Sequence, residues 1–510
     1  MFDIAPHFNS VNIITDGTYS HISSTGTTVP GAMDIMIDGY RFEISITGSA
    51  VDAADIRAIP LTSKGCFSHS VFPLTYYIVS DVWHTFKDAV SFTPTELRDL
   101  GGYFITKPPC TEMTFNHLFY THEDISTHKV SLGRIDLLNN AEEVYAPAGN
   151  VYDNKFTGFF ALYDDNVVYT LEYSNDADEM EVRKVNFCEG TSSSELILTF
   201  DTIQNYNAQE YVFANVYHMV HLQYEDNDCI VLVVSFQGID PEWVLKVIIY
   251  DINSGVTNED FVDLSTNDYN FDISAMYGSA PASYKEKFIF VINPDGIIAD
   301  PVPTVCVIPT FIVDISTKST ARVENYNTDL GTTWLYVYSP RHGSVIDNGN
   351  EKFYFIAYNT SDTDYKLFSM DLNTETIALV SSFADVALYQ GFPDCYGVDL
   401  SNGHVKTIPG LTTIATLPVV PLGENSIFID SANDIIWSCT DGTFSGVSLD
   451  NTDTGYSLPV AWSGGSLPFT FSEGQKVYVR PLAGICIVFL YSNDGAGSYR
   501  QQWYLLRRCI

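Results

Sequence analysis

One short pattern recurs along this chain and constrains its fold more than any other feature. In KLFSMDLNTETIALVSSF, residues 366–383, an apolar strand ends in Asp and an aliphatic residue, a polar turn follows, and a second apolar strand begins. The pattern returns in IYDINS at 249–254, IVDIST at 312–317 and GVDLSN at 397–402. Apolar runs separated by Asn, Ser and Thr are typical of strands joined by turns. The pattern therefore predicts repeated antiparallel hairpins in an all-β chain.

Looser copies extend the repeat to both sides. They are GRIDLLNN at 133–140, GVSLDNTDTG at 446–455 and the degenerate VRKVNFCEGTSSSELILTF at 182–200. The Asp positions of the clear copies and of GRIDLLNN are Asp136, Asp251, Asp314, Asp371 and Asp399. Three or four strands every 40 to 60 residues or so is the rhythm of β-propeller blades, which cover one another's apolar faces. We predict a β-propeller with seven blades favoured and six or eight as alternatives. A β-sandwich or two unrelated β domains remain open.

The N-terminal part lacks the repeat and predicts a separate region. Residues 1–110 contain Gly, Ser and Thr-rich stretches such as SSTGTTVPG at 23–31, so we expect a small domain or docking arm there and the propeller at 111–510. GYRFEISITG at 39–48 is the expected strand that closes the ring with the three C-terminal strands. A T-x-x-E capping box at Thr93 and Glu96, with Pro94 between them and Gly101 behind, predicts one short helix.

The net charge of −38 limits the partners of the chain. It reflects 25 Lys and Arg against 63 Asp and Glu, so basic residues are scarce. Non-specific binding to DNA needs basic residues to displace counterions, and we expect no sequence-specific nucleic acid binding. No run of 18 apolar residues occurs, which predicts no membrane insertion. The start does not read as a signal peptide, so we expect synthesis in a reducing cytoplasm.

The nine cysteines favour free thiols over a disulfide framework. The count is odd, no C-x-x-C occurs, and several lie inside apolar runs such as CIVLVV from residue 229. Cysteine in such runs behaves as a small buried apolar residue. The six tryptophans are scattered singly, and we expect most of them to pack between blades.

The histidines and acidic loops define no catalytic, cofactor or metal residue. His117, His122 and His128 lie in one stretch, and His218 and His221 form H-x-x-H in what reads as a strand, where residues three apart point to opposite faces. A zinc site there is the disfavoured alternative. The acidic loops EYSNDADEMEV at 172–182 and YEDNDC at 224–229 could offer oxygens to Ca²⁺, but neither follows the calcium-loop pattern, and we read them as solvated turns.

Motifs of propeller enzymes are weak or absent. SNDGAGSY at 492–499 resembles the turn motif of propeller sialidases at Ser492, Asp494 and Ser498, with Tyr499 in the tryptophan place. Such a turn marks a blade and carries no catalytic group. No WD dipeptide, G-x-S-x-G or phosphate-binding loop occurs. Two acids from different blades could still meet across a sugar, so glycoside hydrolysis or lyase chemistry remains open.

In overall plan the chain resembles the tail nozzle proteins of short-tailed bacteriophages. The resemblance rests on a large acidic β protein with irregular hairpin repeats, an extended N-terminal region and no catalytic motif. It implies a virion structural protein that assembles in the host cytoplasm as a homo-oligomeric ring, contacts other virion proteins and uses no cofactor. A propeller module that binds a host-surface glycan or receptor is the second expectation, and a propeller glycoside hydrolase or lyase the third.

Overall fold

The computed structural model describes strands from Val11 to Cys509. Side chains are described within residues 117–121, 130–136, 141–146, 157–174, 178–187, 192–238, 243–262, 281–291, 310–323, 343–357, 365–381, 386–390, 394–421, 426–427, 429, 435–438 and 445–450.

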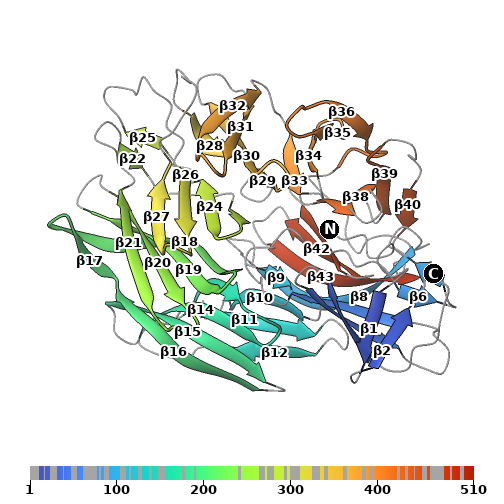
Figure 1. The fold of residues 1–510 in the computed structure, drawn as a ribbon, viewed down its shortest axis with the longest axis horizontal. Helices are drawn as coiled ribbons and strands as arrows, with labels where there is room; N and C mark the ends of the chain where they lie inside the picture. Colours follow the sequence, from blue (N-terminus) through green and yellow to red (C-terminus); the bar gives the residue numbers. More distant parts are fainter. Residues whose placement is uncertain are drawn as a thin grey trace. The chain divides into compact units, whose positions relative to one another are not determined.

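The chain is all-β, and its sheets are built like propeller blades. Each of these sheets has four or five antiparallel strands. Eight such sheets follow one another between β9 and β43 in the described part of the chain, which is one of the two alternatives to the favoured count of seven. The predicted fold class is therefore confirmed at the level of strands and sheets (Figure 1).

Five of the eight sheets lie between β9 and β32. They comprise β9 (Thr111–Met113), β10 (His117–Asp124), β11 (Lys129–Asp136) and β12 (Glu142–Tyr145); β13 (Phe156–Leu162), β14 (Val167–Tyr173), β15 (Glu179–Cys188) and β16 (Thr191–Asp201); β17 (Ile203–Tyr206), β18 (Gln209–Tyr224), β19 (Asn227–Gln237), β20 (Trp243–Asp251) and β21 (Thr257–Asp263); β23 (Ala282–Tyr284), β24 (Lys287–Val291), β26 (Thr310–Asp314) and β27 (Ser319–Arg322); β28 (Trp334–Val337), β29 (Ser344–Asp347), β30 (Lys352–Asn359), β31 (Tyr365–Asp371) and β32 (Ile377–Ser381).

Three further sheets follow toward the C-terminus. They comprise β33 (Ala387–Gln390), β34 (Cys395–Val398), β35 (His404–Thr407) and β36 (Thr413–Thr416); β37 (Ile427–Asp430), β38 (Ile435–Thr440), β39 (Thr443–Ser448) and β40 (Tyr456–Pro459); and β41 (Lys476–Leu482), β42 (Ile485–Asn493) and β43 (Tyr499–Cys509), which is joined by β8 (Ser91–Tyr103).

The remaining strands form smaller or separate sheets. They are a five-stranded sheet of β1 (Val11–Thr15), β2 (Thr18–Ile22), β3 (Ala32–Ile37), β4 (Tyr40–Ile46) and β5 (Ala54–Pro60), and the pairs β6 (Tyr77–Val79) with β7 (Val82–His84) and β22 (Asn270–Asp272) with β25 (Gly296–Ile298). No helix long and apolar enough to span a membrane occurs among the residues described.

Two expectations for the N-terminal part are wrong. The segment predicted as a helix from Thr93 to Gly101 lies inside β8, where backbone pairing with β43 overrides the local capping signal. An N-terminal strand does complete the last sheet, but the donor is β8. The expected donor, at 39–48, contains β4, which pairs with β3 and β5 instead.

The chain divides into two compact units. One consists of residues 63–68 and 107–388, and the other of residues 1–62, 69–106 and 389–510. This division does not show whether residues 1–110 fold alone, so the boundary at 110 stays a prediction. The polar contacts between neighbouring sheets described below lie in the unit of residues 107–388.

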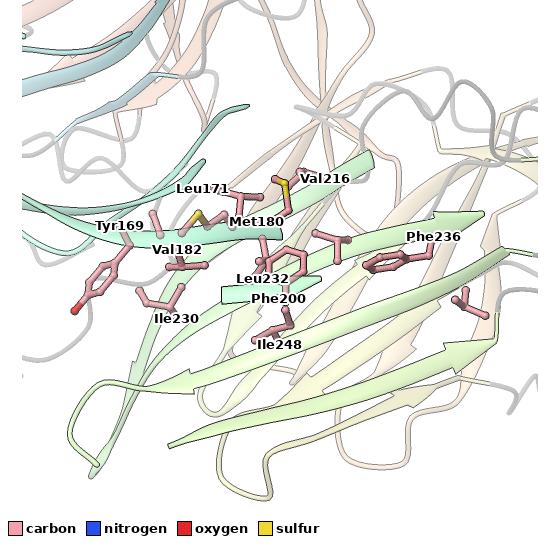
Figure 2. Packing of buried hydrophobic residues seen from close by; sticks show 14 of the residues in the cluster. Tyr169, Leu171, Met180, Val182, Phe200, Val216, Ile230, Leu232, Phe236 and Ile248 are labelled. Carbon is pink, nitrogen blue, oxygen red and sulfur yellow. The ribbon is translucent and has the colours of Figure 1, made fainter. Parts of the chain in front are cut away.

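The core of that unit lies between successive sheets. Strand β19 illustrates this arrangement, because its successive residues belong alternately to two hydrophobic clusters. Cys229, Val231 and Val233 pack with Phe288 and Phe311 of the following sheet. Ile230, Leu232 and Val234 join a cluster with Leu171, Met180 and Val182 of the preceding sheet (Figure 2). The continuous apolar run at 229–234 therefore reflects a strand that is buried on both faces.

Candidate functional site

The recurring Asp of the repeat closes a side-chain turn. In the turn after β20, Asp251 Oδ1 accepts hydrogen bonds from the backbone N–H groups of Asn253 and Ser254, each at 3.0 Å. Asp314 and Asp371 make the same pair of bonds after β26 and β31. The KLFSMDLNTETIALVSSF stretch is thus the outer hairpin β31–β32 of its sheet, as predicted.

The aliphatic residue after each Asp ties this turn to the neighbouring hairpin of the same sheet. Ile252 donates its N–H to Asp228 O, and Ile315 and Leu372 donate theirs to Glu286 O and Glu351 O. These bonds hold two turns of each sheet side by side. We call the edge that carries them the turn edge.

One copy of the motif occupies a different place. Asp399 closes the same kind of turn, with Ser401 N–H at 3.0 Å, but between β34 and β35, the second and third strands of their sheet. In that sheet Ile408 donates to Cys395 O, so Thr407 and Ile408 match the Asp-aliphatic pair of the other sheets. This explains why Asp399 follows Asp371 by only 28 residues.

Polar side chains join successive sheets along the turn edge, beginning with β9–β12 and β13–β16. His117 Nδ1 lies 3.3 Å from Asp165 Oδ1. Arg134, which is buried, donates to Asp165 O at 2.6 Å and to Asn166 Oδ1 at 2.8 Å. Arg134 also contacts the Glu143 carboxylate in its own sheet.

A buried histidine–carboxylate pair follows at the junction of β13–β16 with β17–β21. His221 Nε2 lies 2.5 Å from Asp228 Oδ1, and Tyr163 donates its hydroxyl to Asp228 Oδ2 at 3.3 Å. The Tyr163 and His221 rings are 4.7 Å apart. His221 Nδ1 is buried and has no hydrogen-bond partner among the residues that the structure describes. Burial and the Asp228 carboxylate raise the pKa of Tyr163, which keeps its hydroxyl protonated.

A lysine joins β17–β21 to β23–β27. Lys318 Nζ lies 3.0 Å from Asp251 Oδ2 and donates to Cys229 Sγ at 2.8 Å. Burial opposes the Asp251 charge, but the Ser254 N–H and Lys318 outweigh it and lower the pKa of Asp251. Burial raises the pKa of the Cys229 thiol, and Lys318 only partly offsets this effect.

Glu351 is the centre of the junction between β23–β27 and β28–β32. It accepts hydrogen bonds from Asn373 Nδ2 at 2.6 Å, Tyr284 OH at 2.6 Å and Lys285 Nζ at 3.0 Å. These donors lower the pKa of Glu351 to about 2. Nearby, Lys287 Nζ lies 2.9 Å from Glu375 Oε1 and donates to Leu372 O.

A second polar cluster lies buried between β12, β14 and β15. Glu172 accepts hydrogen bonds from Tyr145 OH at 2.9 Å and Thr170 Oγ1 at 2.8 Å. Arg183 pairs with Glu181 at 2.7 Å and lies 3.9 Å from Glu172. Burial and the Glu172 carboxylate raise the pKa of Tyr145. The donors of this cluster compensate the buried charge of Glu172.

The histidines do not form a metal site in the described residues. His218 and His221 lie on β18 and face opposite sides, as predicted: His218 packs on Phe288 and Phe290, and His221 faces Asp228. Burial lowers the pKa of His218 to about 3, which makes it a neutral core residue. Among the residues described, no group of three metal-type side chains comes together. The side chains of His122 and His128 lie outside the described residues.

The acidic loops are only partly the solvated turns that we expected. Glu225 and Asp226 are exposed in the turn β18–β19, whereas Glu172 and Asp228 are buried and hydrogen-bonded. Both side chains point into the interior because of strand alternation. Their hydrogen-bond partners could not be predicted from the local sequence. The sialidase-like residues Ser492, Asp494, Ser498 and Tyr499 lie outside the described side chains.

The prediction of buried free thiols is confirmed for Cys229 and Cys395. Trp243 packs between two sheets with Phe288 and Phe311, as predicted, whereas Trp437 is buried and its packing between sheets stays a prediction. Sequence reasoning missed Tyr163, Lys318 and Glu351, because their partners lie in neighbouring sheets. The signal available for Lys318 was its place as the fifth residue of a repeated turn, where Gly255 stands in the preceding sheet.

Most carboxylates of the turn edge bind donors. Hydrogen-bond donors outweigh the effect of burial and lower the pKa of Asp251, Asp314, Asp371 and Glu351. Burial instead raises the pKa of Glu142, which lies just after the β11–β12 turn and accepts a hydrogen bond from Tyr120 OH. A general acid needs a raised pKa to hold a proton near neutral pH. The four carboxylates with a lowered pKa are suited to hold turns and to bind lysine and tyrosine donors from the next sheet.

The sequence matches no known family model and no curated relative. At the level of structure, the chain is similar to oligogalacturonate lyase in complex with manganese, with 9% identity over 94% of this chain and 99% of that chain and a TM-score of 0.39. It is also similar to the β-propeller domain of the Trilobed protease from Pyrococcus furiosus, with 11% identity, 80% and 94% coverage and a TM-score of 0.33. TolB from Acinetobacter baumannii gives 11% identity, 68% and 67% coverage and a TM-score of 0.28. Likeness at this level carries no argument about function.

Proposed function

We propose that the chain is a structural propeller subunit of a virion, a tail or nozzle component that assembles into an oligomeric ring or attachment module. The supporting observation is the use of charged side chains along the turn edge. The lysines, the buried arginine and the carboxylates described there join sheets or close turns. Charged side chains that join neighbouring sheets stiffen the subunit. A stiff subunit is suited to transmit mechanical load from one neighbouring subunit to another.

The charge of the chain supports the same proposal. A net charge of −38 with only 25 Lys and Arg disfavours adhesion to DNA. A ring of such subunits lets DNA pass through its bore without retaining it. Assembly in the host cytoplasm and contacts with other virion proteins belong to this proposal.

Light scattering on the purified protein at low and high concentration is the first test. We expect a ring-sized oligomer, or a monomer that assembles as the concentration rises. A stable monomer at every concentration would contradict a self-assembling structural subunit. Retention of DNA by the assembled ring at low salt would contradict the proposed role of the acidic charge.

The competing functions are separated by two direct assays. Saturable binding to a glycan array by the monomer would establish the receptor-binding alternative. Turnover of a polysaccharide, followed by reducing ends or by absorbance of an unsaturated product, would establish a hydrolase or lyase. We expect neither activity.

A further inference from the structure

The contact between Cys229 and Lys318 joins two nucleophilic atoms from different sheets. Cys229 is the third residue of β19, and Lys318 immediately precedes β27. Lys318 Nζ lies 2.8 Å from Cys229 Sγ, so the two atoms already touch. A covalent bond between them needs only a small closing movement of a flexible lysine side chain.

Several restraints hold the lysine against the thiol. Asp251 Oδ2 lies 3.0 Å from Nζ, and Asn227 Oδ1 lies 3.5 Å away. Lys318 also has a positive φ of 55°, a backbone region that favours glycine. Gly255 takes this place in the preceding sheet, with a φ of 69°, and Glu375 takes it in the following sheet, with a φ of 55°. Of these three turns, the one after β26 carries a lysine, and its amine lies against a buried sulfur.

We propose that Cys229 and Lys318 form a sulfur–nitrogen cross-link between the sheets β17–β21 and β23–β27 when the protein meets a hydroperoxide. The proposal concerns these two side chains and does not depend on the proposed virion function.

The chemistry balances in two steps. The Cys229 thiolate attacks one oxygen of the hydroperoxide and breaks its O–O bond, which gives a sulfenic acid and, after protonation, water or an alcohol. The sulfur is oxidised by two electrons, and the peroxide is reduced by two. The Lys318 amine, after losing a proton to solvent, then attacks the sulfenic sulfur. An S–N bond forms, the S–O bond breaks, and the hydroxyl leaves as water after protonation.

The environment sets the rate of the first step. Cys229 is fully buried, whereas the Lys318 side chain is 18% exposed, so a small peroxide approaches along the lysine. Burial raises the pKa of the thiol, which keeps the thiolate scarce at neutral pH. We therefore expect a reaction that is slow at neutral pH and faster as the pH rises.

Cys395 is a matched control within the chain. It is also a buried thiol outside any disulfide, but its sulfur accepts a hydrogen bond from the Gln390 side-chain amide, at 3.6 Å. An amide nitrogen is a poor nucleophile because its lone pair is delocalised into the carbonyl. Oxidation of Cys395 therefore leaves a sulfenic acid or a higher oxide and forms no link to Gln390.

The test treats the native full-length protein with hydrogen peroxide, followed by digestion and mass spectrometry. We expect linked peptides that contain Cys229 and Lys318, lighter by two hydrogens than the sum of the free peptides and separated again by dithiothreitol. Lys318→Arg, which keeps a cation beside the thiol, and Cys229→Ser should both abolish the linked peptides. Protein treated in urea should not form them, because the contact belongs to the fold.

Two results would overturn the proposal. One is recovery of Cys229 as sulfinic or sulfonic acid in wild-type protein with no linked peptide. The other is unreacted Cys229 under conditions that oxidise Cys395. Circular dichroism of each variant comes first. If Cys229→Ser does not fold, the comparison of wild type with Lys318→Arg decides the question alone.

Discussion

His221 and Asp228 form a hydrogen-bonded pair in the interior, with Nε2 and Oδ1 2.5 Å apart and both side chains almost fully buried. The two residues come from neighbouring strands of one sheet. Tyr163, from the preceding sheet, donates its hydroxyl to the same carboxylate. A single carboxylate thus satisfies two donors from two sheets.

Asp228→Ala should lower the free energy of unfolding by about 2–5 kcal/mol, because it removes the carboxylate that buried His221 and half-buried Tyr163 bind. Urea denaturation of the variant and the wild type measures the difference. Asp226→Ala is the matched control, since Asp226 is exposed in the adjacent turn and should change stability by no more than about 0.5 kcal/mol. Equal effects of the two substitutions would contradict a stabilising role of the buried carboxylate.

Glu351 should make the stability of the protein depend on pH in the acidic range. Hydrogen bonds from Asn373, Tyr284 and Lys285 lower its pKa to about 2 from an ordinary value of 4.5. A carboxyl group whose pKa is lowered in the folded state stabilises that state at pH values above its ordinary pKa. This contribution to stability is lost as the pH falls from 4.5 toward 2. The difference in stability between wild type and Glu351→Gln should therefore be present at pH 7 and shrink over that interval.

Denaturant titrations at several pH values between 7 and 2 check this prediction. Glu225→Gln is the control, because Glu225 is an exposed glutamate in the turn β18–β19 with the same φ of 51°. A difference between wild type and Glu351→Gln that stays constant down to pH 2 would refute the role of the Glu351 carboxylate.

Gly446 should tolerate no side chain, because it lies directly across β38 and β39 from Trp437. A Cβ at Gly446 would lie 2.7 Å from Trp437 Cε3, and the indole is fully buried. Gly446→Ala should destabilise the protein by about 1–3 kcal/mol through overpacking. Gly349→Ala, whose new methyl would meet only Asp347 Oδ1 at 3.5 Å, is the comparison in thermal unfolding and should be milder.

The recurring Asp can be tested in the hairpin that revealed it. Asp371→Ala removes the acceptor of the Asn373 and Thr374 N–H groups and should cost about 1–2 kcal/mol. Asp371→Asn keeps one side-chain oxygen for these donors and should cost less. Urea unfolding of both variants measures the order. A loss as large for Asn as for Ala would mean that the negative charge, and not the turn geometry, matters at this position.

The hairpin repeat could be predicted from sequence because its information is local. An apolar run, an Asp and a polar turn are enough to specify β31–β32, and the strand character of β18 followed from alternation in the same way. The place of Asp399 within its sheet could not be predicted, because that information is not local. The same Asp turn can join different pairs of strands, and only the pairing of the strands shows that Asp399 lies between β34 and β35.

The errors and omissions came from contacts between distant parts of the chain. The capping box at Thr93 and Glu96 is a local signal, but β8 is fixed by its pairing with β43. Lys318 reaches Cys229, and Glu351 binds Tyr284, across sheets that no pattern within one hairpin connects. The polar junctions therefore needed the structure, whereas the apolar run of β19 indicates a strand in the sequence itself.

The pairing of β8 with β43 also has a consequence for the order of folding. Tyr103 pairs with Tyr499, so this sheet is completed only after the chain has been synthesised beyond residue 499. Until then β8 has no partner from β43 and leaves an open strand edge, which favours association with other chains. Contacts of such long sequence separation also form slowly. Closure of this sheet is therefore expected to be a late step on the ribosome, and a point where chaperones improve the yield of native protein.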